Sequence, residues 1–235
     1  MRFLLLLLLA APVAAQPSAG AIVDAWLADW RRAASGVGRV EADEAAVWTV
    51  DGPRGLLEVE ADGVLIWSEG RPEREVDRLI VDGERVDARR ANAAGDRWHR
   101  AFGPASREVL RPPSLPGRLL ARGEPAGSAP DVYEGQPAWR VTFGRGGQAW
   151  FTRSAASPRL LAVRFEGERE GREGRGGRRR GASGQLVREV RYVRVSGLDL
   201  PASAETQFTV RQRRRLREYF VTLTASAGYS RHVVR

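Results

Sequence analysis

The chain has 235 residues and a formal net charge of +9, and it contains no cysteine. The lack of cysteine excludes disulfides, thiolate metal sites and cysteine nucleophiles. All 38 basic residues are arginine, and most of the charge lies in residues 166–181 (+2) and 211–217 (+5). The rest of the chain is nearly neutral, so we expect an ordinary packed core and no general nucleic-acid surface.

The first fifteen residues, MRFLLLLLLAAPVAA, have the layout of a secretory signal peptide. Arg2 precedes an apolar run, and small residues end the segment at Ala15. We expect cleavage before Gln16 and, because no cysteine follows, no lipid anchor there. These residues therefore predict a soluble periplasmic protein, with a buried N-terminal helix as the alternative.

Residues 19–34 have the period of an amphipathic helix. Apolar side chains recur at steps of three and four, at Ile22, Trp26, Trp30 and Ala33, and glycine follows at Gly36. This spacing places the apolar side chains on one face, so we predict a helix that packs against the core.

The period changes to two in the next part of the chain. Short runs that favour strands lie at residues 47–50, 54–61, 64–68 and 75–81, separated by the turn-like sequences DGP, ADG, EGRP and VDG. No stretch of helix length separates these runs, so we predict a meander of antiparallel strands.

Residues 96–137 are rich in proline and irregular. Short helices are expected within residues 96–102, 105–111 and 115–122, and an exposed loop at 123–130. Because Trp98, Phe102 and Leu119 would have no use in a linker, we interpret the segment as an insertion resembling a lid. A boundary between two small domains is the alternative.

From Ala138 onward we predict five strands in up-and-down order. The turns at residues 144–147, 166–184 and 211–215 then emerge at one end of the sheet, about 10 Å apart. The middle turn contains EGEREGREGRGGRRRG, which has no apolar side chain to bury and is expected to be disordered.

Two of these turns form a predicted basic rim. We interpret the Arg/Gly turn first as a solvated insertion and second as part of a surface for an anionic membrane or an envelope protein. The basic rim consists of Arg175, Arg178, Arg179, Arg180, Arg213, Arg214 and Arg215.

Catalytic and metal-binding patterns are not evident. The two histidines, His99 and His232, have no second ligand at metal spacing, and a GxSxG sequence is absent. The neighbouring carboxylates Asp43 and Glu44 are expected on an exposed strand face. We therefore predict a protein without catalysis, metal or cofactor.

The predicted fold is α+β: a curved antiparallel sheet forming a half-barrel, with the N-terminal helix and the proline-rich insertion covering the concave face. Such an interior can hold a lipid chain, although ordinary core packing is the alternative for each aromatic residue. The residues predicted to line the cavity are Trp26, Trp30, Trp67, Trp98, Leu119, Trp139 and Phe151.

Four segments, PAWRVTF, AWFTRSAASPRLLAVRF, VREVRYVRVSGLDLPASAETQF and YFVTLTASAGYS, resemble the bacterial outer-membrane lipoprotein-sorting superfamily of periplasmic lipoprotein carriers. The resemblance implies an eleven-stranded half-barrel closed by helices, a hydrophobic cavity for acyl chains and no catalysis. We accordingly expect a monomer that binds a lipid or an acylated lipoprotein.

Two other functions remain as alternatives. The first is a structural or interaction module of the cell envelope with the same fold, a filled core and no ligand. The second, nucleic-acid binding through the Arg/Gly segment, is disfavoured by export and by the lack of aromatic residues in that segment.

Overall fold

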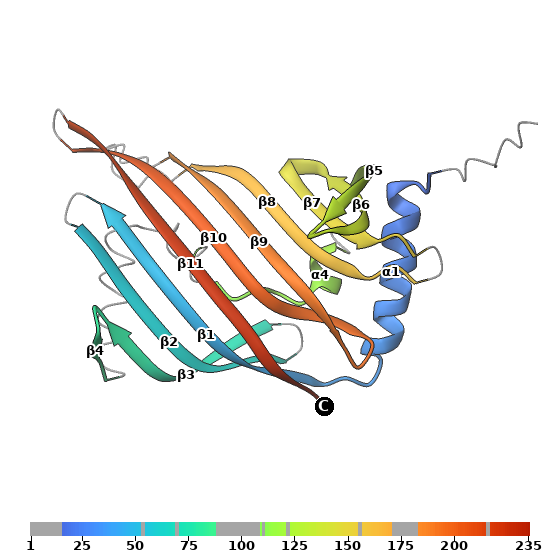
Figure 1. The fold of residues 1–235 in the computed structure, drawn as a ribbon, viewed down its shortest axis with the longest axis horizontal. Coiled ribbons are helices and arrows are strands. Elements are labelled where there is room, and N and C mark those ends of the chain that lie inside the picture. The colour runs from blue at the N-terminus through green and yellow to red at the C-terminus, as the bar shows by residue number, and fades with distance from the viewer. Residues whose placement is uncertain are drawn as a thin grey trace, which may run out of the picture.

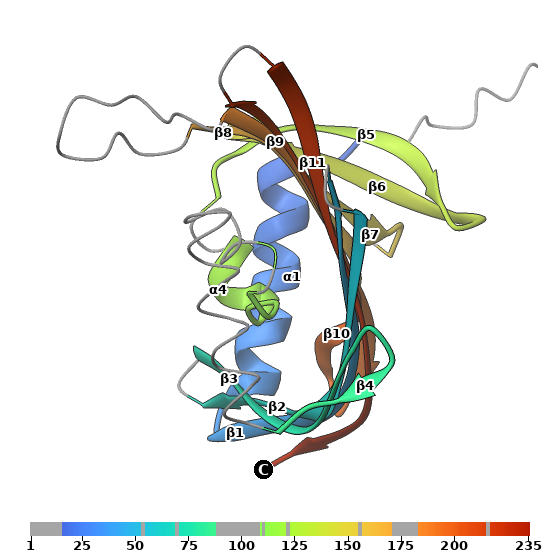
Figure 2. The same ribbon diagram turned by 90° about the vertical axis from the view of Figure 1, so that its left-hand side faces the viewer.

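The computed structural model describes residues 16–52, 55–68, 71–87, 109, 111–120, 123–154, 157–170, 183–214 and 217–235. The described strands form one curved, open antiparallel sheet with the helix α1 (Ala19–Ala34) on its concave side (Figures 1 and 2). The prediction of a curved antiparallel sheet with an N-terminal helix is confirmed.

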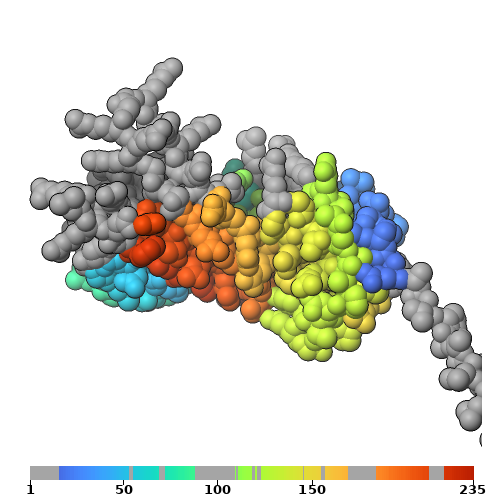
Figure 3. All heavy atoms as spheres, turned by 90° about the horizontal axis from the view of Figure 1, so that it is seen from above, coloured from blue at the N-terminus to red at the C-terminus, as the bar shows by residue number. Residues whose placement is uncertain are grey.

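The sheet has eleven strands in the order β4-β3-β2-β1-β11-β10-β9-β8-β7-β6-β5. Neighbours in the chain are neighbours in the sheet, and the two halves join where β1 pairs with β11. Seen from above, the coloured surface follows the same order from β1–β3 through β11 to β5 (Figure 3). The strands are β1 (Arg39–Gly52), β2 (Gly55–Ser68), β3 (Arg71–Val81), β4 (Glu84–Arg85), β5 (Pro125–Tyr133), β6 (Gln136–Phe143), β7 (Gly147–Thr152), β8 (Leu160–Glu170), β9 (Ser183–Val195), β10 (Leu198–Arg214) and β11 (Arg217–Val234).

The helix α1 begins at a serine cap and buries one side. The Ser18 side chain accepts a hydrogen bond from the Ala21 amide at 3.2 Å, which satisfies one of the free amides at the helix start. Ile22, Trp26 and Leu27 are buried, as the spacing predicts. The short helix α4 (Pro116–Leu120) packs against α1, and a Cβ at Gly117 would lie 2.3 Å from the Trp30 ring.

The sequence ADG does not end a strand. It lies within β2, where the register to β3 shifts between Asp62 and Gly63. A Cβ at Gly63 would lie 2.0 Å from the Glu75 carbonyl oxygen, so the position requires glycine. The prediction of a turn is therefore wrong, because the same residue types also permit a β-bulge in a continuous strand.

The predicted loop at residues 123–130 is also wrong, because β5 begins at Pro125. The strand lies at the edge of the sheet, where Pro125 and Pro130 can be accommodated without loss of ladder hydrogen bonds. The irregular insertion therefore ends before residue 125. The helix predicted at 96–102 lies outside the described residues.

The C-terminal half contains six strands, β6 to β11, one more than predicted. The β8–β9 and β10–β11 turns contain fewer residues than predicted, because β8 continues to Glu170, β9 begins at Ser183 and β10 continues to Arg214. The expected turn at residues 211–215 is therefore mostly strand.

The ends of these hairpins are staggered. Gly147, the first residue of β7, pairs with Phe165, which is five residues before the end of β8. At 3.3 Å per residue, the β6–β7 turn therefore lies about 17 Å short of the end of β8. The predicted spacing of about 10 Å assumed strands without stagger, whereas the strands of a curved sheet are sheared.

Candidate functional site

An apolar surface lies on the concave face away from α1, and we call it the concave wall. No residue of α1 belongs to it, and Val109 is its one described member outside the strands. The concave wall consists of Ala46, Trp48 and Val50 of β1, Val59 and Ala61 of β2, Leu186 of β9, Phe208 and Val210 of β10, Val221, Leu223 and Ala225 of β11, and Val109.

A buried ion pair borders the concave wall. Arg74 of β3 donates from Nη2 to Glu44 Oε1 of β1 at 2.7 Å, and its Nε donates to Glu44 Oε2. The Arg74 guanidinium carbon also lies 5.2 Å from the centroid of the Trp48 ring, within the range of a cation–π contact. Gly63 faces Glu44 across the β1–β2 pair and carries no side chain that could separate β1 from β3.

Glu44 is 4% exposed, so its expected place on an exposed face is wrong. In β1 the buried residues Ala42 and Ala46 are two positions away on either side. Because side chains alternate along a strand, Glu44 shares their face. This alternation is the sequence signal that could have identified the site.

A depression of about 10 Å³ lies beside this ion pair. That volume accommodates about one water molecule, so the concave wall is filled in this conformation. Arg188 of β9 closes one side by donating from Nη2 to the Arg111 carbonyl at 2.8 Å. The lining residues are Trp48, Arg74, Val109, Arg111, Arg188, Ala204, Thr206, Ala225, Ala227 and Tyr229.

Tyr229 is the tyrosine of this lining. Burial raises the pKa of its hydroxyl, and the nearby Glu44 carboxylate raises that pKa further. The hydroxyl therefore stays protonated at neutral pH, and the Glu44 side chain is a hydrogen-bond partner for it. The depression thus combines a neutral donor, three arginines and an apolar wall.

The structure separates the predicted cavity residues into two clusters. Trp26 of α1 and Phe151 of β7 are fully buried between the helix and the sheet, with ring centroids 6.0 Å apart. Trp139 packs against this cluster, and Trp30 packs against both clusters. Trp67 belongs to a different cluster and donates from Nε1 to the Pro113 carbonyl at 2.8 Å. Trp98 and the Leu119 side chain lie outside the described residues.

Asp199 attaches α1 to the sheet. Its carboxylate is 1% exposed and accepts from Trp26 Nε1 at 2.6 Å and from the Leu160 amide at 3.1 Å. Arg194 Nη1 lies 3.4 Å from the same carboxylate. One buried carboxylate therefore connects α1, β8, β9 and β10.

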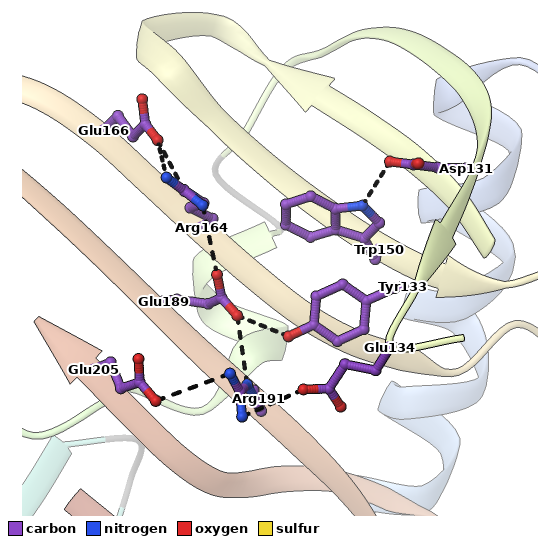
Figure 4. Close-up of polar contacts among 9 residues, drawn as sticks. All are labelled: Asp131, Tyr133, Glu134, Trp150, Arg164, Glu166, Glu189, Arg191 and Glu205. Carbon is purple, nitrogen blue, oxygen red and sulfur yellow. Dashed lines mark hydrogen bonds and ion pairs between the residues drawn. The ribbon is translucent and has the colours of Figure 1, made fainter. Parts of the chain in front are cut away.

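The convex face carries a separate polar network near the tip of the β5–β6 hairpin (Figure 4). Tyr133 donates to Glu189 at 2.8 Å, and its ring centroid lies 5.2 Å from that of Trp150. Trp150 Nε1 donates to Asp131 at 3.0 Å, and this hydrogen bond lowers the pKa of the Asp131 carboxyl.

The charges of this network are paired along the strands. Arg164 pairs with Glu166 at 2.6 Å, and Arg191 pairs with Glu134 at 3.3 Å. Because these arginines already form ion pairs with carboxylates, we interpret the network as one that holds the β5–β6 hairpin against the sheet.

The basic rim is described only in part. Arg213 and Arg214 lie in β10 and face Glu218 and Arg217 of β11 in the register. Arg215 and the rim arginines at 175 and 178–180 lie outside the described residues, so the rim remains a prediction.

In the part of the chain that the structure describes, no group of three or more His, Asp or Glu side chains could hold a metal ion. Among the described helices, none is long and apolar enough to cross a membrane.

Comparison with known proteins gives a weak structural similarity. No family model matches the sequence, and no curated protein matches it. Among solved structures, the chain is similar to one in the MucA/MucB complex of Pseudomonas aeruginosa, at 11% identity and a TM-score of 0.19, over 87% of this chain and 93% of that one. A similarity of this size establishes neither a family nor a shared function.

Proposed function

We propose that this is an exported, non-enzymatic periplasmic protein that binds a lipid, or the acyl chain of a lipoprotein, against the concave wall. The observation that carries the proposal is the concave wall itself, which is apolar across β1, β2, β9, β10 and β11 and lies outside the area covered by α1. Burial of an acyl chain on such a surface is worth about 0.8 kcal/mol per methylene group.

The polar border of the wall suits an amphipathic ligand. Arg74, Arg111 and Arg188 line the depression together with Tyr229, and Arg74 also contacts the Glu44 carboxylate. An anionic end group could accept from these donors while its chain lies on the wall.

Uptake requires a change of conformation, since the depression holds about 10 Å³. Val109 would leave the wall, and the hydrogen bond from Arg188 to the Arg111 carbonyl would open. Ala46, Ala61 and Ala225 are buried in this conformation, and their small side chains would leave space along the wall after Val109 is displaced.

The test is the binding of fluorescent fatty acids to delipidated protein. We expect saturable uptake and about fourfold tighter binding for each added methylene group, which is the equivalent of about 0.8 kcal/mol. An Ala225→Trp variant should bind fatty acids at least about tenfold more weakly, because the indole would occupy the space along the wall that the acyl chain needs.

Ser226→Trp is the matched control for this variant. Ser226 is the next residue of β11 and is exposed on the opposite face, so its replacement should leave uptake unchanged. Circular dichroism would confirm that both variants fold. If folded wild-type protein takes up no fatty acid of any chain length, lipid binding is excluded.

The small volume of the depression favours a second function, an interaction module of the cell envelope that uses the same fold without a ligand. The two functions differ in one observable. The module predicts no lipid bound to protein purified from its native envelope, whereas the carrier predicts lipid that mass spectrometry can identify.

We further propose that the basic rim meets an anionic membrane surface. Each arginine near such a surface contributes about 1 kcal/mol. Replacing Arg213, Arg214 and Arg215 with serine should therefore weaken binding to anionic liposomes by about a hundredfold and reduce its salt dependence. Serine at Arg32, Arg78 and Arg231 is the control, and an equal loss in both variants would contradict a specific rim.

A further inference from the structure

A second depression, of about 490 Å³, lies where the β7–β8 connection meets the end of β9. It is lined by Thr152, Ser154, Ser157, Arg159 and Arg194, with no carboxylate among these lining residues. Arg194 is eight residues along β9 from Leu186 of the concave wall, or about 26 Å at 3.3 Å per residue. This depression is therefore distinct from the wall.

Two hydroxyl groups in this depression have hydrogens to donate. The Thr152 hydroxyl oxygen accepts from the Arg159 amide at 3.0 Å, and the Ser154 hydroxyl oxygen accepts from the Ser157 amide at 3.3 Å. A hydroxyl that accepts from an amide retains its own hydrogen for another acceptor. Ser157 differs, because its hydroxyl donates to Asp29 at 2.6 Å.

Both arginines are held at the site by the fold. The backbone of Arg159 pairs with Thr152, whose amide donates to the Arg159 carbonyl at 2.9 Å. The Arg159 side chain is exposed and forms no ion pair with a carboxylate in the described part of the chain. Arg194 contacts Asp199 through Nη1, and that carboxylate is also stabilised by Trp26 and the Leu160 amide.

We propose that this depression binds a phosphate group through Arg159, Arg194 and the hydroxyls of Thr152 and Ser154. A phosphate has several acceptor oxygens and suits the forked donors of arginine better than a group with a single acceptor. The volume falls within the range of small-molecule sites, so it also admits the group to which the phosphate is attached.

Calorimetric titration with inorganic phosphate at constant ionic strength tests the site. We expect saturable binding that Arg159→Gln weakens about tenfold. The side chain of Arg159 is exposed, so this variant should fold. Arg231→Gln is the control, because Arg231 is also exposed and pairs with Asp43 on the β1–β11 pair.

A second experiment separates free phosphate from a lipid headgroup. Vesicles of neutral lipid, with and without phosphatidic acid, are tested for binding to the same variants. Binding of inorganic phosphate that depends on Arg159 supports a soluble ligand, and binding limited to phosphatidic acid vesicles with the same dependence supports a headgroup. The proposal is overturned if the protein binds neither inorganic phosphate nor phosphatidic acid vesicles, or if Arg159→Gln binds them as tightly as wild type. Fatty-acid uptake does not enter either experiment.

Discussion

Asp199→Ala should lower the free energy of unfolding by about 3–5 kcal/mol. The variant leaves the Arg194 guanidinium without its buried partner, and it leaves the Trp26 indole and the Leu160 amide without their acceptor. The indole and the amide are buried, and leaving a buried donor without an acceptor costs about 1–3 kcal/mol for each group. Urea denaturation followed by tryptophan fluorescence would measure the change.

Glu166→Ala is the control for Asp199→Ala. Glu166 is also paired with an arginine, Arg164, but both side chains are more than 40% exposed. An exposed pair contributes about 0–1 kcal/mol, so the control should be nearly as stable as wild type. Equal losses in the two variants would mean that Asp199 does not attach α1 in the way described.

Glu44→Ala should also lower the free energy of unfolding by about 3–5 kcal/mol, the second of the two largest effects that we expect. The Arg74 side chain is 18% exposed and lies over Trp48, so without Glu44 its charge remains mostly buried beside an apolar surface. Replacing both residues, as in Glu44→Ala with Arg74→Met, should recover part of the loss because the arginine charge is removed from the apolar surface together with its carboxylate. Thermal and urea denaturation would give both values.

The neighbouring residue supplies the matched control for Glu44. Asp43 pairs with Arg231 at 2.9 Å, and both side chains are exposed. Asp43→Ala should therefore cost less than about 1 kcal/mol. A double variant no more stable than Glu44→Ala would argue that Glu44 acts through packing and not through its charge.

The sequence is sufficient to predict the elements that have a strong local period. The spacing of Trp26 and Trp30 predicts α1, and the alternating runs predict an antiparallel sheet. The lengths of the strands are not local properties. ADG is compatible with a turn, and it becomes a bulge because β2 continues to pair with β1 on one side and β3 on the other.

The candidate site was less predictable, because its polar groups come together through register. Arg74 and Glu44 are 30 residues apart and meet across β2. Asp199 lies between Leu198 and Leu200, and all three are buried, so alternation alone would assign it wrongly to an exposed face. Of the predicted cavity residues, Trp26 and Phe151 pack in one cluster and Trp67 in another, and neither cluster is the concave wall.

The pairing of β1 with β11 has a consequence for how the chain folds. It joins segments about 190 residues apart, as in the pair Glu41 and Val233, and it lies in the interior of the sheet, not at an edge. Contacts of such long range require the closure of a large loop, and chains dominated by them fold slowly. The strands β1 to β4 can therefore join the rest of the sheet only after β11, the last strand of the chain, has been synthesised.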